Sequence, residues 1–155
     1  MSTITESIDV DVNVTTAYNQ WTQFESFPRF MEGVDTISQV DDTHTHWVVS
    51  MAGVQREFDA TITEQHPDER VAWRSDDGPQ HAGVVTFRPL GDATTRVTAQ
   101  MDIDPDSFVE NAADKLGILN RRVKGDMVRF KEFIESRGTE TGQWRGDTDR
   151  PGTTH

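Results

Sequence analysis

The chain has 155 residues, no cysteine, and 27 acidic against 15 basic residues, which gives a formal net charge of −12. This length predicts a single domain, and the 4 Trp and 8 Phe argue against a disordered chain. The acidic excess disfavours nucleic acid as a partner, because phosphate backbones are bound through Lys and Arg. The lack of cysteine excludes disulfides and thiolate chemistry.

Residues 1–7 lack the positive region and apolar run of a signal peptide, and no stretch of the chain is long enough to span a bilayer. We therefore expect a cytoplasmic protein without stable membrane insertion, present as a monomer or a homodimer. Residues 1–138 are predicted to form the domain. Residues 139–155 are polar and rich in Gly, and they are expected to form a flexible tail.

The chain is predicted to begin with a strand and one or two short helices. Apolar and polar residues alternate over residues 4–12, the two-residue period of a half-buried strand. From residue 17 to residue 24 the large apolar residues recur at three- and four-residue intervals, so a helix is expected, with Thr15 or Thr16 as its N-cap. Pro28 is expected to break it before a second helical turn.

The middle of the chain predicts six strands separated by short polar turns. Because parallel neighbours need long crossovers, strands linked this closely indicate an antiparallel meander. The expected strands cover residues 34–40, 46–51, 56–65, 71–75, 83–87 and 97–103.

Beyond Pro105 the period becomes helical, and a long helix is predicted over residues 106–137. At Gly117 and Gly125 a bend or a separate upstream helical piece is expected, and Gly138 is a natural C-cap. One face carries an apolar stripe made of Phe108, Ala112, Leu116, Leu119, Val123, Met127, Phe130 and Ile134.

Several segments of the chain carry a resemblance to a known family. They are residues 16–21 (TAYNQW), 24–31 (FESFPRFM), 83–90 (GVVTFRPL), 95–98 (TRVT), 127–135 (MVRFKEFIE) and 141–146 (TGQWRG). With this element order, the chain resembles the polyketide cyclase/dehydrase branch of the START-like superfamily. The resemblance implies an α+β helix-grip fold, in which a curved antiparallel sheet of about seven strands wraps around the long C-terminal helix.

A strongly curved sheet cannot close completely against one helix, so we expect a cavity between them. The same side chains could instead form an ordinary core. A one-residue error in the phase of a strand would turn all of its predicted inward side chains to the outer face. The expected lining residues are Trp47, Met51, Phe58, Ile62, Trp73, His81, Phe87 and Met101 on the strands and Leu116, Leu119 and Val123 on the helix.

Two side chains are weak candidates for catalysis. His81 is in phase with the inward strand positions and could orient a ligand carbonyl or shuttle a proton. Cross-strand ion pairs on the outer face are expected among Arg56, Asp59, Glu64 and Arg74, which lie on neighbouring strands. In the reversed strand phase, Arg74 would point inward and could polarise a ligand carbonyl.

No metal or cofactor is expected. His44 and His46 share one face of a strand, but no third ligand is evident, so a solvated hairpin is the better interpretation. No glycine-rich phosphate loop or nucleophile elbow is present in the sequence.

The leading hypothesis is that the domain binds a hydrophobic or polycyclic small molecule, and the resemblance implies a polyketide cyclase or dehydrase. A non-catalytic lipid or quinone carrier, or a stress-related binding module, is the alternative. A third hypothesis is a protein-interaction domain whose cavity is filled by Trp47, Trp73 and Phe87. Fold alone does not choose among them.

Overall fold

The computed structural model describes residues 2–31, 33–51, 54–77, 81–104 and 114–137. The remaining residues include the predicted tail, Gly138, and the positions of Phe108 and Ala112, which therefore lie outside the described part. The elements are β1 (Ser2–Val10), α1 (Val14–Trp21), the 3-10 helix η1 (Phe24–Arg29), β2 (Val34–Gln39), β3 (His44–Met51), β4 (Val54–His66), β5 (Arg70–Ser75), β6 (His81–Gly91), β7 (Thr94–Ile103) and α3 (Lys115–Arg137).

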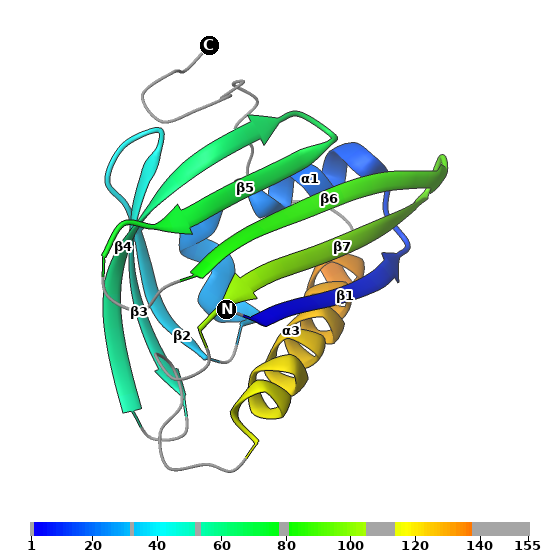
Figure 1. The fold of residues 1–155 in the computed structure, drawn as a ribbon. Coiled ribbons are helices and arrows are strands. Elements are labelled where there is room, and N and C mark those ends of the chain that lie inside the picture. The colour runs from blue at the N-terminus through cyan, green and yellow to red at the C-terminus, as the bar shows by residue number, and fades with distance from the viewer. Residues whose placement is uncertain (1, 32, 52–53, 78–80, 105–113, 138–155) are drawn as a thin grey trace.

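The strands form one 7-stranded sheet in the order β1-β7-β6-β5-β4-β3-β2. Every neighbouring pair is antiparallel, as the short links of the meander predict. β1 is the edge strand next to β7 and pairs with it along its whole length, from Ser2 opposite Ile103 to Val10 opposite Thr95. The sheet curves, and α3 lies along its concave side (Figure 1). The predicted helix-grip architecture is confirmed.

The caps and breaks of the short helices differ from the prediction. Asn13 is the N-cap of α1, and its Oδ1 accepts a hydrogen bond from the Thr16 N–H at 2.8 Å, so the expected cap at Thr15 or Thr16 is wrong. Pro28 lies inside η1 instead of ending a helix before it. Proline already has a helix-like φ, and a single short 3-10 helix loses only one hydrogen bond to it.

α3 is one continuous helix of 23 residues, although Gly117 and Gly125 were expected to bend it. A glycine costs a helix only about 1 kcal/mol, which packing of the apolar face on both sides of it can offset. At the start of the helix, Asp114 Oδ1 accepts a hydrogen bond from the Gly117 N–H at 3.0 Å, in the manner of an N-cap. Among the described residues, no helix is long and apolar enough to cross a membrane.

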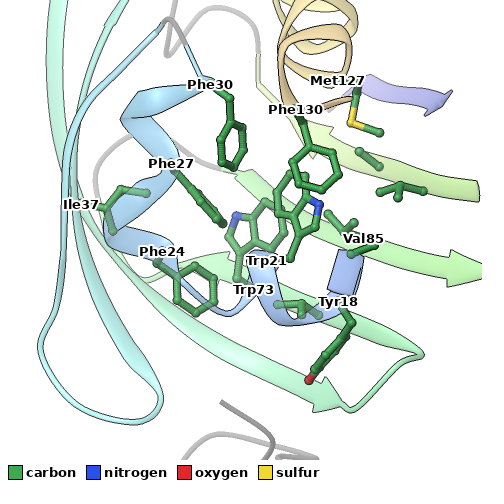
Figure 2. Close-up of a cluster of buried hydrophobic side chains, with 14 of the residues drawn as sticks. Tyr18, Trp21, Phe24, Phe27, Phe30, Ile37, Trp73, Val85, Met127 and Phe130 are labelled. Atoms are coloured by element: carbon green, nitrogen blue, oxygen red, sulfur yellow. The ribbon is translucent and has the colours of Figure 1, made fainter. Parts of the chain in front are cut away.

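Aromatic packing joins α1 and η1 to the C-terminal half of α3. The ring of Trp21 lies 5.1 Å from that of Phe27, 5.8 Å from that of Phe30 and 5.2 Å from that of Phe130. Phe30 and Phe130 also meet edge-on, at 5.3 Å. These four residues, which we call the aromatic cluster, fill the space between the short helices and α3 (Figure 2).

Candidate ligand cavity

Beside the aromatic cluster, a partly enclosed cavity of about 100 Å³ remains between the concave face of the sheet and α3. Its wall is almost entirely apolar, as expected of small-molecule sites. The lining residues are Trp21 of α1, Phe27 and Met31 at η1, Val34 of β2, Trp47 and Val49 of β3, Phe58 of β4, Trp73 of β5, His81 and Val85 of β6, Ala99, Met101 and Ile103 of β7, and Leu119, Arg122, Val123, Asp126 and Met127 of α3.

Strand register brings the aromatic side chains of the sheet together. Trp47 is paired across β3 and β4 with Phe58, and their rings stack at 5.8 Å with an interplanar angle of 17°. Trp73 on β5 also stacks with Trp47, at 6.3 Å and 20°. These three flat rings make one wall of the cavity.

Gly83 allows Trp73 to lie flat across β6. The two residues are cross-strand partners, and a Cβ atom at Gly83 would lie only 2.5 Å from Cζ2 of the Trp73 indole. Any larger residue would force the indole away from the sheet and into the cavity. From the sequence, Gly83 was recognised only as part of an alternating strand. A glycine at an inward strand position often marks close approach of another group, and this signal could have predicted the contact with Trp73.

His81 lies in the cavity wall, where the strand alternation places it. The residue is 5% exposed, and its backbone N–H donates to Ser75 Oγ at 3.1 Å. Its ring meets Phe58 edge-on at 4.7 Å and Trp47 edge-on at 6.3 Å. A titratable side chain is therefore held among aromatic rings and contributes to the lining.

On the helix side, two charged residues join the apolar stripe. Asp126 and Arg122 line the cavity beside Leu119 and Val123. The carboxylate of Asp126 pairs with Arg129, whose Nε also donates to the Phe30 carbonyl at 3.1 Å. Arg122 follows Leu119 by three residues and Asp126 follows Val123 by three, and this spacing was the signal that these side chains border the same space.

The half-buried lining residues mark the mouth of the cavity. Met31 and Val34 lie on the side of η1 and β2, and Arg122, Val123 and Asp126 lie on the side of α3. Methionine is flexible and polarisable, so Met31 can adapt its shape to a passing or bound molecule. Met101 of β7 is the other half-buried lining residue, so the more accessible part of the wall is shared by η1, β2, α3 and β7.

The structure brings most of the predicted lining residues together. Trp47, Phe58, Trp73, His81, Met101, Leu119 and Val123 all line the cavity. The side chain of Met51 lies outside the described part of the chain.

Three predicted lining residues lie elsewhere. Ile62 is fully buried beside a bulge in the pairing of β4 with β5, where the register shifts. Phe87 packs edge-on against Tyr18 of α1 at 5.5 Å, which places it beyond the cavity. Leu116 is 39% exposed, because it lies at the start of α3, before the first turn that packs against the sheet.

Arg74 is exposed on the outer face of the sheet, so the reversed strand phase and an inward guanidinium are wrong. Trp73, its neighbour in the chain, takes the inward position. Glu64 does form an ion pair, but its partner is Arg70 of β5, which was not among the predicted partners.

The two histidines near the β3 hairpin make ion pairs on the outer face. His46 Nδ1 lies 2.7 Å from Asp59 and its Nε2 lies 3.2 Å from Glu57, and these hydrogen bonds, Asp59 first, raise the pKa of His46. His44 Nδ1 lies 2.8 Å from Asp41, whose pKa is lowered first by the Thr43 N–H and then by His44. Within the described ranges, no group of three or more metal-binding side chains occurs.

Residues 10–132 match the protein family described as polyketide cyclase/dehydrase and lipid transport. The chain is also 61% identical over 147 residues to an uncharacterised 17.2 kDa protein of Streptomyces lincolnensis, which spans 94% of this chain and 98% of that protein. The chain belongs to this family. The predicted resemblance to polyketide cyclase/dehydrase proteins is thereby confirmed.

Solved structures share the fold of this family member at low sequence identity. The Zhui aromatase/cyclase of a Streptomyces species matches with a TM-score of 0.74 and 12% identity over 92% of this chain and 99% of that one. A START superfamily protein from Mycobacterium smegmatis matches with a TM-score of 0.66 and 11% identity over 87% and 95% of the two chains. At such identities the likeness establishes the helix-grip fold alone.

Proposed function

We propose that this family member binds a hydrophobic small molecule about one aromatic ring in size, in the cavity between the sheet and α3. The observation that carries the proposal is a wall built from flat rings, in which both Phe58 and Trp73 stack with Trp47. Aromatic side chains offer large contact areas with few rotatable bonds, so little entropy is lost when they hold a ligand. Family membership and the fold shared with the Zhui aromatase/cyclase support the same role.

The volume of the cavity limits the size of the ligand. An apolar cavity of roughly 150 Å³ holds benzene, whereas ligand sites in general span roughly 300–1,000 Å³. At about 100 Å³, the space is smaller than that cavity, so a single ring is the largest ligand that suits it without movement of the lining. A polycyclic molecule or a long acyl chain would need the side chains at the mouth, Met31 and Val123 among them, to move outward.

Native mass spectrometry of the protein purified from its own host tests this proposal, followed by extraction of any bound molecule. We expect a retained one-ring aromatic compound, or uptake of added toluene by the empty protein. A retained quinone or acyl lipid would support the carrier alternative and would contradict the size limit. Failure to retain any compound and to take up toluene would overturn the proposal.

A second candidate function is turnover of the bound molecule, and the position of His81 favours it. Its imidazole faces a cavity that also carries Asp126 on the opposite wall. For a bound β-hydroxy ketone, the imidazole can take the proton from the carbon next to the carbonyl and return it to the departing hydroxyl. The carbon–oxygen bond breaks, a carbon–carbon double bond forms, and water leaves.

Dehydration of a one-ring β-hydroxy ketone, followed by ultraviolet absorption, tests this second function. We expect His81→Asn to lower the rate at least about 100-fold, the usual size of a general acid–base contribution. Arg74→Ala is the matched control, because Arg74 lies on the outer face and its loss should leave the rate unchanged. Equal rates for wild type and His81→Asn would exclude His81 as the base.

A further inference from the structure

A single arginine of α3 joins the end of η1 to the wall of the cavity. The Nε–H of Arg129 donates a hydrogen bond to the backbone carbonyl of Phe30 at 3.1 Å, and its Nη2 pairs with the carboxylate of Asp126. Phe30 is the C-cap residue of η1, and Asp126 lines the cavity. One side chain therefore bridges a short helix, the long helix and the cavity.

Gly125 leaves room for the guanidinium of Arg129 on the surface of α3. A Cβ atom at Gly125 would lie 3.2 Å from Nη1 and 3.3 Å from Nη2 of Arg129. Long side chains on a helix lean toward its N-terminus, so the guanidinium passes over the residue one turn earlier. With glycine there, the Arg129 side chain can fold back along the helix as far as Asp126.

The hydrogen bond from Arg129 also fixes the peptide group that precedes Met31. The carbonyl of Phe30 and the N–H of Met31 belong to one planar peptide group. Arg129 binds the carbonyl, and the N–H donates to the Phe27 carbonyl at 2.7 Å. Because both of its polar atoms are bonded, this group has a fixed orientation, which sets the direction in which the half-buried Met31 side chain leaves the backbone.

We propose that Arg129 determines the largest ligand that the cavity accepts, because it keeps Met31 in place at the mouth. This inference rests on the proposed function and deepens it by naming a residue that sets ligand size. A molecule larger than one ring needs Met31 to move outward, and that movement strains or breaks the hydrogen bond to Phe30. Arg129 acts through Met31, so it is a positioning residue.

Ring contacts should keep η1 on α3 when Arg129 is replaced. The ring of Phe30 lies 5.3 Å from each of the rings of Phe130 and Phe133, and the guanidinium of Arg29 lies 5.5 Å from the centre of the Phe133 ring. Figure 2 shows Phe30 and Phe130 facing each other. Loss of the Arg129 hydrogen bond should therefore free the peptide group before Met31 without releasing η1.

Toluene and naphthalene test the proposal, because both are apolar and naphthalene is larger by a fused ring. Calorimetric titration of the protein into each probe measures the two affinities, and the quantity of interest is the ratio of naphthalene to toluene affinity. Arg129→Leu keeps an aliphatic side chain and removes every donor. It also removes one partner of Asp126, but that change acts on both probes alike and cancels in the ratio.

We expect Arg129→Leu to raise the ratio about threefold to tenfold relative to wild type, the fold-change of one net hydrogen bond that the larger ligand no longer has to break. Arg121→Leu is the matched control, because it removes the same charge from an exposed position of α3. Its ratio should stay within about twofold of wild type.

Gly125→Leu is a second variant, which decides the outcome if Arg129→Leu does not fold. Its side chain competes with the guanidinium for the same space, so the ratio should rise as in Arg129→Leu. Leucine is also a better helix former than glycine, so α3 should not lose stability. A merely structural role of Arg129 would not change ligand selectivity in this variant.

The methyl signal of Met31 separates the proposed role from a general loosening of the fold. In spectra of protein labelled with ¹³C at the methionine methyl groups, both variants should move the Met31 signal toward that of an unrestrained methionine. The signal of Met127, which is 3% exposed, should stay in place. An unchanged affinity ratio in the folded variants overturns the inference, while binding of toluene leaves the proposed function standing. If wild type binds neither probe, the proposed function fails and this inference fails with it.

Discussion

The two halves of α3 pack differently against the same sheet. In the C-terminal half, Phe130 and Ile134 are completely buried, and Phe130 packs against Trp21 and Phe30. In the N-terminal half, Leu119 and Val123 face a cavity. One apolar stripe on one helix therefore serves as solid core at one end and as cavity wall at the other.

The difference comes from what is inserted between the helix and the sheet. α1 and η1 supply Trp21, Phe27 and Phe30, which occupy the space under the C-terminal half (Figure 2). Under the first half, Trp21 and Phe27 border the space together with Met31 and Val34 but leave part of it unfilled. The cavity is thus the part of the space between α3 and the sheet that the described side chains leave unfilled. A few side chains set its volume.

Phe130→Ala is expected to have the largest effect, because it deletes a ring from the packed half. Loss of a buried phenylalanine costs about 3–5 kcal/mol in the free energy of unfolding. Chemical denaturation followed by tryptophan fluorescence measures it. Val128→Ala, at a position on the same helix that is 42% exposed, should change stability by less than about 0.5 kcal/mol. Similar losses in both variants would contradict the solid packing of this half.

Leu119→Trp should fill the hollow half. We expect binding of a one-ring probe such as acetophenone to weaken at least about tenfold, while stability falls by no more than about 1–3 kcal/mol, the usual cost of overpacking. Calorimetry and denaturation measure the two quantities, and Val128→Trp serves as the exposed control. Complete unfolding of Leu119→Trp alone would show that the position is tight core.

Gly83→Ala is expected to destabilise the fold by about 1–3 kcal/mol, because the added Cβ atom and the rigid Trp73 indole cannot occupy the same space. Gly91→Ala is a matched control on the same strand, since a Cβ atom there meets nothing within 4 Å. Thermal unfolding of the two variants gives the comparison. If Gly83→Ala left the stability unchanged, Trp73 would be able to move at little cost in free energy, and the cavity wall would be able to change its shape.

The smallest expected effect lies on the outer face of the sheet. The carboxylates of Asp59 and Glu57 raise the pKa of His46 above the ordinary value of 6.5. The charged form is thus favoured by folding: its contribution is fully present below pH 6.5 and is lost as the pH rises through the raised pKa. His46→Gln should therefore be less stable than wild type at low pH and equal to it at high pH.

The expected difference for His46→Gln is below about 1 kcal/mol, because the pair is partly exposed and screened by solvent. Denaturation at a series of pH values measures it, and an NMR titration reports the pKa of His46 directly. Asp59→Asn should bring that pKa back toward its ordinary value, since Asp59 is the largest cause of the shift. A stability difference that grows with rising pH would contradict this assignment.

Much of the fold could be predicted because its signals are local. The two-residue alternation in the strands and the stripe from Leu119 to Ile134 follow from the geometry of single elements. The N-cap was less predictable, because Asn13, Thr15 and Thr16 are all acceptable capping residues and only the chain's path selects Asn13.

The candidate site could be predicted only in part. Trp47, Trp73 and His81 were found because strand phase orients them inward. Ile62 has the predicted inward phase, opposite Trp73, but it is fully buried outside the cavity lining, and strand phase alone cannot separate a core side chain from a lining one. Asp126 and Arg122 were missed because charged residues on a helix usually mark its solvated face.

By itself, the sequence determined the family, the antiparallel meander, the terminal helix and the inward phase of most strands, because each depends on a short-range repeat or a motif. Only the tertiary structure decided which inward side chains pack solidly and which border a hollow. That choice depends on how side chains from α1, η1, the sheet and α3 share one volume. The side chains that fill this volume come from segments far apart in the sequence. The spacing of residues along the chain therefore does not predict whether they fill it completely.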